Sequence, residues 1–134
     1  MRTAFRIIAS LTSLAVVIQV GLAGYGAFNA IDKADNASVT KKTIENGFDP
    51  HGVVGTIVLA LMLILLIVGL IGRTHVRTAA ILFALGIVQI LLAWGGTGAA
   101  WVGFFHGVNA LAIAGVAGSH AGNLWREARV ASPA

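Results

Sequence analysis

Four apolar segments dominate the sequence, and none of them contains Asp, Glu, Lys or Arg. They comprise residues 7–30, 50–72, 78–96 and 100–122. Each is close to the roughly 20 residues that an α-helix needs to cross a bilayer, and none alternates polar and apolar residues as the strand of a membrane barrel does. The remainder of this 134-residue chain is short. The sequence therefore predicts a single-domain, all-α integral membrane protein, an up-down bundle of four transmembrane helices.

The composition agrees with a lipid environment and excludes several classes of site. Hydrophobic residues make up 57% of the chain and charged residues 10%, whereas about a quarter of the residues in soluble domains are charged. The formal charge of +4 does not indicate a nucleic-acid partner, because the basic residues are dispersed at segment ends. The chain has no cysteine, which excludes disulfides, thiolate metal sites and covalent c-type haem attachment.

All six arginines flank the apolar segments on one predicted side of the membrane. They are Arg2, Arg6, Arg73, Arg77, Arg126 and Arg129. The positive-inside rule predicts that this side is cytoplasmic, together with both termini and a short tail over residues 123–134. The basic start is also typical of a secretory signal, but the apolar stretch is longer than a signal core and no clean A-x-A site follows, so we predict a helix. Usage rich in Arg, Ala and Gly fits a bacterium, and we expect a multi-pass protein of the bacterial inner membrane.

Residues 31–49 carry most of the remaining charges and predict one substantial outer loop. In the sequence "FDPHG", Asp49 is suited to cap the following amides and Pro50 to occupy the first helical position. The second helix is therefore expected to begin at Pro50, with His51 in its first turn.

The first and third apolar segments resemble each other, and so do the second and fourth. "VIQVGLAGYG" over residues 17–26 matches "IVQILLAWGG" over residues 87–96, while His-Gly-Val occurs at residues 51–53 and again at 106–108. This order predicts a duplicated helical hairpin with both copies in the same membrane orientation. In an up-down bundle the second and fourth helices then lie on a diagonal, and His51 and His106 are expected to face each other near the outer face.

Two facing imidazoles inside a membrane bundle are suited to bind haem iron, one on each side of the macrocycle. Bis-histidine ligation leaves no open coordination position, which favours electron transfer over oxygen chemistry. Gly55 and Ala110 lie one turn deeper than the two histidines and leave space beside them. Asn109 is a candidate to orient a ligand or a haem propionate. The sequence thus predicts haem b with His51 and His106 as the metal ligands.

Gln19 and Gln89 are a second buried polar pair, at comparable depth in the first and third helices. One interpretation is a hydrogen bond between helices. The other is a contact with a bound cofactor or quinone.

Two further histidines lie near the arginine-rich side. His75 falls in the connection "RTHVR" and is expected to be a solvated loop residue. His120 follows His106 by fourteen residues, nearly the same helix face about 21 Å deeper. The position fourteen after His51 is Leu65, so the sequence does not predict a second bis-histidine haem.

These stretches resemble those of a family of small, uncharacterised bacterial four-helix membrane proteins, with "QVGLAGYGAF" in the first helix, then "HGVVG" and "FHGVNAL" opening the second and fourth. More distantly, the chain is similar to one four-helix half of haem A synthase, in which each half has paired histidines on its second and fourth helices. The resemblance implies a haem-b pocket between His51 and His106. The synthase has a glutamate one turn before the first histidine, where this chain has Phe48, and synthase activity would require two copies to pair.

Three functional hypotheses follow from the sequence. The first is a haem-b-binding electron-transfer or haem-handling subunit, in contact with the lipid bilayer and with respiratory-chain components or a homodimer partner as possible associates. The second is a cofactor-free structural or accessory subunit whose histidines form hydrogen bonds between helices. The third is a haem-modifying enzyme of the synthase type. The apolar segments contain no carboxylate for acid-base catalysis, so a non-enzymatic role is favoured and no catalytic residue is assigned.

Overall fold

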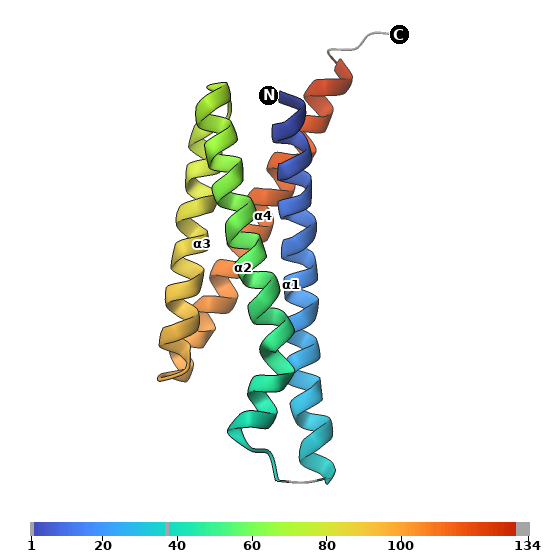
Figure 1. Cartoon of the computed structure of the whole chain (residues 1–134), viewed down its shortest axis with the longest axis vertical. Helices are drawn as coiled ribbons and strands as arrows, with labels where there is room; N and C mark the ends of the chain where they lie inside the picture. Colours follow the sequence, from blue (N-terminus) through green and yellow to red (C-terminus); the bar gives the residue numbers. More distant parts are fainter. Residues whose placement is uncertain (1, 37, 131–134) are drawn as a thin grey trace.

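The computed structural model describes residues 2–36 and 38–130 and is an up-down bundle of four long α-helices (Figure 1). The helices are α1 (Arg2–Asn36), α2 (Lys41–Gly72), α3 (Val76–Gly96) and α4 (Ala100–Val130). α1 packs against α2 and α4, and α3 packs against the same two helices, so α2 and α4 lie on one diagonal of the bundle and α1 and α3 on the other. This confirms the predicted four-helix bundle and its diagonal pairs.

All four helices are long and apolar enough to cross a membrane. Their outward faces carry many large apolar side chains, among them Phe28 at 73% exposed and Leu111 at 70%. Apolar faces of this extent are characteristic of surfaces that contact lipid rather than water. The chain is therefore a multi-pass membrane protein in contact with a bilayer.

The helices extend beyond the apolar segments, and the structure corrects the predicted outer loop over residues 31–49. α1 continues to Asn36 and α2 already begins at Lys41, because the end of an apolar run indicates where lipid ends and not where a helix ends. Charged residues there are compatible with helix: Lys41 and Glu45 form an i,i+4 ion pair of 3.5 Å on α2. Figure 1 shows this hairpin reaching beyond the α3–α4 turn.

The start of α2 is also corrected. Thr40 is its N-cap, and its side-chain oxygen accepts a hydrogen bond of 3.2 Å from the amide of Thr43. Asp49 therefore caps nothing, and Pro50 lies inside the helix, where its missing N–H leaves one turn without its hydrogen bond. His51 is consequently ten residues into α2 rather than in its first turn.

The other end of the chain follows the same rule. α4 continues through Val130, so residues 123–130 of the predicted tail are helical, and residues 131–134 lie outside the described part. The α3–α4 connection over residues 97–99 is short, as predicted.

Buried side chains are concentrated in the half of the bundle nearest the termini. They come from all four helices and include Phe5, Met62, Leu65, Leu82, Ile113 and Leu124. Figure 1 places the two termini and the α2–α3 turn at this same end. The other half is less densely packed, and it contains the histidine pair described below.

The extended α1–α2 hairpin depends on one close approach. A Cβ at Gly26 would lie 2.9 Å from the ring of Phe48 and 3.0 Å from the carbonyl oxygen of Gly47. At Gly24, two residues earlier in the same helix, a Cβ would meet no atom within 4 Å. Only the first position is closed to a side chain.

We expect Gly26→Ala to destabilise the protein by about 1–3 kcal/mol, since the added methyl overlaps a ring and a backbone carbonyl that cannot both move away. Thermal unfolding in detergent measures the effect, and Gly24→Ala is the matched control. Equal melting temperatures for the two variants would contradict the close approach of α1 and α2.

Candidate functional site

His51 on α2 and His106 on α4 face each other across the bundle. Their ring centroids are 6.1 Å apart and the ring planes are tilted by 58°. Both side chains are partly buried, and they come from the two diagonal helices. The structure thus brings together the two residues that the sequence nominated as a facing pair.

His51 is held to α1 by a reciprocal pair of hydrogen bonds. Its Nδ1 lies 3.0 Å from the main-chain oxygen of Gln19, and the Gln19 side-chain Nε2 donates to the main-chain oxygen of His51 at 2.8 Å. Since a carbonyl oxygen only accepts, Nδ1 must carry the proton. His51 Nε2 therefore presents a lone pair.

The second hairpin repeats the hydrogen bond from Nδ1 to a glutamine main-chain oxygen. His106 Nδ1 donates to the main-chain oxygen of Gln89 at 3.0 Å. The Gln89 side-chain Nε2 lies 3.0 Å from His106 Nε2, and because an amide NH₂ can only donate, His106 Nε2 is again the acceptor. Both imidazoles therefore have the same tautomer, with the proton on Nδ1 and the lone pair on Nε2.

Asn109 on α4 forms hydrogen bonds to α3 and to the side chain of Gln89. Its Nδ2 donates to the main-chain oxygen of Leu85 at 3.0 Å and to Oε1 of Gln89 at 2.6 Å. Its amide is thus bonded to α3 and does not line the cavity between the histidines. Asn109 orients Gln89, and Gln89 in turn contacts His106.

A cavity of about 300 Å³ surrounds the two imidazoles and is lined by all four helices. Its walls include His51, His106, Gln19, Gln89, Gly55 and Ala110. Apart from the two histidines, none of the described lining residues has an ionisable side chain, so the cavity offers no carboxylate for acid-base chemistry. Two neutral nitrogen donors in an apolar cavity are suited to bind a metal centre.

Gln19 occupies part of this space. Its Nε2 lies 2.9 Å from where a Cβ at Gly55 would be, so the absence of a side chain at Gly55 leaves room for the glutamine amide. The Gln19 Oε1 is buried and has no hydrogen-bond partner. An unsatisfied buried oxygen costs free energy, and a donor that enters the cavity would relieve that cost.

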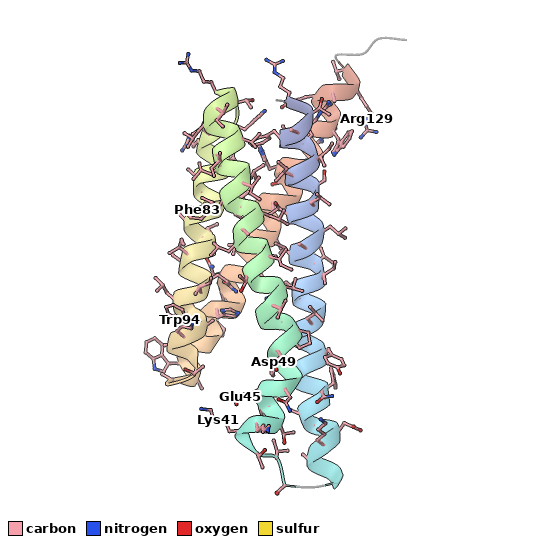
Figure 2. The ribbon with its side chains drawn as sticks, viewed as in Figure 1. Lys41, Glu45, Asp49, Phe83, Trp94 and Arg129 are labelled. Atoms are coloured by element: carbon pink, nitrogen blue, oxygen red, sulfur yellow. The ribbon has the colours of Figure 1, made fainter. Side chains whose placement is uncertain are left out.

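The cavity lies in the half of the bundle away from the chain termini. Figure 2 shows Trp94 there, on α3, far from Arg129 at the end of α4, with Asp49, Glu45 and Lys41 further along α2. Trp94 lines the cavity and is 71% exposed, in keeping with an interfacial aromatic. Phe48 packs against His51 edge-on at 6.2 Å between ring centroids.

The sequence interpretation missed a second histidine pair. His75, expected to be a solvated loop residue, is exposed but lies 5.1 Å from the ring of His120. Phe5 contacts both rings. The pairing depends on the left-handed backbone of His75, with φ 51°, which no residue pattern in "RTHVR" indicates.

Comparisons of the chain with protein-family models, with curated proteins and with solved structures gave no match. The similarity to one half of haem A synthase therefore stays a prediction. The functional argument rests on the geometry of the site.

We expect Asn109→Leu to destabilise the protein by about 1–3 kcal/mol, because the partly buried amide oxygen of Gln89 loses its donor and the main-chain oxygen of Leu85 loses one hydrogen bond. Thermal unfolding in detergent measures this change. Ser119→Ala is the control, since the Ser119 hydroxyl is exposed and bonds only within its own helix. An Asn109→Leu variant as stable as Ser119→Ala would contradict the role of Asn109 in orienting Gln89.

Proposed function

We propose that this chain is a haem-b-binding membrane protein in which His51 and His106 are the two axial ligands of one iron. The observation that carries the proposal is the 6.1 Å spacing of two imidazoles whose Nδ1 atoms are both bonded to main-chain carbonyls.

The spacing supports ligation of one metal from opposite sides. A ring nitrogen lies about 1.2 Å from the imidazole centroid and about 2 Å from a bound metal, so a linear arrangement separates the centroids by about 6.4 Å and a tetrahedral one by about 5.2 Å. The separation of 6.1 Å is close to the linear value. A linear pair leaves the plane between the two rings for a macrocycle.

The hydrogen bonds support the same ligand set. Metal-binding histidines usually donate their second ring nitrogen to a carbonyl or a carboxylate, which fixes the tautomer and the ring orientation. Here the carbonyls of Gln19 and Gln89 have that role, so Nε2 is the free ligand atom on His51. On His106, haem binding requires the Gln89 amide to release Nε2.

The position of the pair supports a planar ligand. Since the histidines belong to one diagonal of the bundle, a flat group between them extends toward the other diagonal, where Gln19 and Gln89 lie. Gly55 and Ala110 keep the walls next to each ligand thin. The unsatisfied Gln19 Oε1 is a further polar atom at the edge of this space.

The equal anchors support a duplicated hairpin as the origin of the site. In each half, a histidine donates to the main-chain carbonyl of a glutamine on the preceding helix, at 3.0 Å in both cases. A site built from two copies of one hairpin has a pseudo-twofold axis that passes between the ligands. That symmetry suits a metal with two identical axial positions.

The proposed role is electron transfer or haem handling near the outer face of a bacterial inner membrane. Two axial imidazoles leave the iron no open position, which suits electron exchange. All six arginines lie toward the opposite end of the bundle, and the positive-inside rule makes that end cytoplasmic. Respiratory-chain components are the proposed class of partner.

A second candidate function is a cofactor-free membrane subunit. It is favoured by the Gln89–His106 contact, which already satisfies both ring nitrogens of His106 within the protein. In that case the histidines serve only to hold each hairpin together. Haem titration, described below, separates this function from the first one, because a cofactor-free subunit binds no haem.

Titration of the purified chain with haem tests the first proposal. We expect one haem per chain, with the absorption spectrum of a six-coordinate bis-imidazole iron, because His51 and His106 face each other as one pair of ligands. His51→Ala and His106→Ala should each abolish this spectrum, whereas His75→Ala, at the other end of the bundle, should retain it. A Soret band unchanged in His106→Ala, or no haem binding by the unaltered chain, would contradict the proposal.

Gln89→Leu tests whether Nε2 of His106 is the ligand atom. If His106 Nε2 binds haem, removing its competing donor should tighten binding by about fivefold, the equivalent of about 1 kcal/mol for one hydrogen bond. Gln19→Leu is the matched control, because Gln19 donates to a main-chain oxygen and not to Nε2 of His51. Weaker haem binding in Gln89→Leu than in the control would contradict the assignment of Nε2 as the ligand atom.

A further inference from the structure

The end of the bundle opposite the proposed haem site contains a pocket of about 480 Å³ with both charged and apolar lining residues. Its lining residues are Arg2, Arg6, Thr74, His75, Leu124, Glu127 and Ala128. They come from the start of α1, from the α2–α3 connection and from the end of α4, and Figure 1 shows these segments at one end of the bundle. From this pocket we infer a binding site for a phosphate-type anion, either free or as the headgroup of an anionic lipid.

The charge of the pocket favours an anion. Arg2 and Arg6 contribute two permanent positive charges, and Glu127 offsets only one of them. His75 and the hydroxyl of Thr74 add hydrogen-bonding groups on the same wall. An oxyanion, with several acceptor oxygens, matches such a set of donors.

Two buried nitrogen atoms next to the pocket have no hydrogen-bond partner in the described structure. They are Nε of Arg6 and Nε2 of His120. His120 is only 9% exposed and lies against the pocket residue His75, at 5.1 Å between ring centroids. Burying an unpaired polar atom costs free energy, so the Arg6 guanidinium, which lines the pocket, still lacks an acceptor for one of its N–H groups.

Arg6 is held in place for this role. Its Nη2 donates to Thr3 at 3.2 Å, and its guanidinium carbon lies 5.3 Å from the centroid of the Trp125 ring. Trp125 is itself fixed by a hydrogen bond of 2.8 Å from its Nε1 to Ser10. The guanidinium therefore enters the pocket wall with its Nε still unpaired.

His75 enters the wall through a strained backbone. It has φ 51° and ψ 24°, a left-handed conformation that costs a non-glycine residue free energy. The conformation brings its ring into stacked contact with Phe5, at 5.3 Å between centroids. The residue with the strained backbone therefore also lines the pocket.

A metal centre fits this pair of histidines less well than an anion does. Their ring nitrogens have no hydrogen bond to a main-chain carbonyl of the described residues, unlike those of His51 and His106, so nothing fixes the tautomer that a metal requires. Within the described residues there is also no group of three or more His, Cys, Asp or Glu side chains that could hold a metal ion. The two arginines would repel a cation.

The location indicates how a lipid would reach the site. The pocket lies at the end of the apolar helices that carries all six arginines, where an anionic leaflet attracts basic residues. Leu124 and Ala128 give the pocket an apolar side next to the charged one. A phosphate headgroup with its acyl chains along α4 fits both sides.

Native mass spectrometry of the full chain in neutral detergent, without haem, tests the inference. The ligands are phosphatidylglycerol and, in a separate arm, inorganic phosphate, with phosphatidylcholine as the zwitterionic control. Binding of phosphatidylglycerol alone identifies a lipid headgroup, and binding of inorganic phosphate identifies a free anion. Binding of neither, or equal binding of phosphatidylcholine and phosphatidylglycerol, would overturn the inference.

Three substitutions locate the binding. Arg6→Gln should weaken binding of the anion by about tenfold, the loss of one charge-assisted hydrogen bond. Arg2→Gln, at an exposed position of the same pocket, should weaken it in the same direction. Arg129→Gln removes the same charge from the end of α4 but outside the pocket (Figure 2) and should leave binding unchanged. An equal loss in Arg129→Gln would mean that only the overall charge matters and would overturn the site.

Glu127→Gln gives an opposite and independent readout. Removing the one carboxylate among the lining residues should tighten binding of the anion, whereas a purely structural role of Glu127 gives no such gain.

Asn tolerates a left-handed backbone better than most residues, so His75→Asn tests the ring of His75 without adding backbone strain. It should weaken binding while the melting temperature stays close to that of the unaltered protein.

Discussion

The histidine-to-carbonyl hydrogen bond that joins the two helices of each hairpin determines the arrangement of the site. It fixes the proton on Nδ1, and with it the direction of the remaining lone pair on Nε2. It also joins α1 to α2 and α3 to α4 at one depth, so packing the two hairpins together brings the two rings to 6.1 Å. In a lipid bilayer this hydrogen bond matters more than in water, since burying an imidazole without a hydrogen-bond partner there costs free energy.

The two halves of the bundle differ in packing and in the polar groups that they contain. In the half near the termini, the four helices pack closely around side chains such as Met62 and Leu82, and the adjoining end is rich in arginine. In the other half, the space between the hairpins is a cavity, and its polar groups are glutamine amides and imidazoles. The first half contains the packed core of the bundle, and the second contains the cavity that the proposed haem would occupy.

Much of this arrangement could be predicted from residue patterns. Charge-free apolar runs predicted four helices in up-down order, and the repeated Gln and His-Gly-Val motifs predicted that His51 and His106 face each other from diagonal helices. Helix ends were less predictable, because α1 and α2 continue as helix past the apolar boundary, with Thr40 and not Asp49 as the cap. The glutamine partners were left open between two interpretations, and only coordinates could assign Gln19 and Gln89 to the main chain and ring of the histidines.

The second histidine pair shows a limit of pattern reasoning. His75 and His120 are separated by a whole hairpin, and their contact depends on a turn in which both Arg73 and His75 have a left-handed backbone. Asn109, proposed from its position to orient a ligand or a propionate, lies behind Gln89 and bonds to α3. In both cases the residue type indicated polarity, but the direction of the side chain was set by packing.

Low-temperature electron paramagnetic resonance of the ferric, haem-loaded protein tests the central claim most directly. If two Nε2 atoms bind one iron, the spectrum is entirely that of a low-spin six-coordinate centre. Replacing either His51 or His106 then converts it to high spin. A high-spin signal from the unaltered protein, or a low-spin signal that survives the loss of His106, would contradict the account.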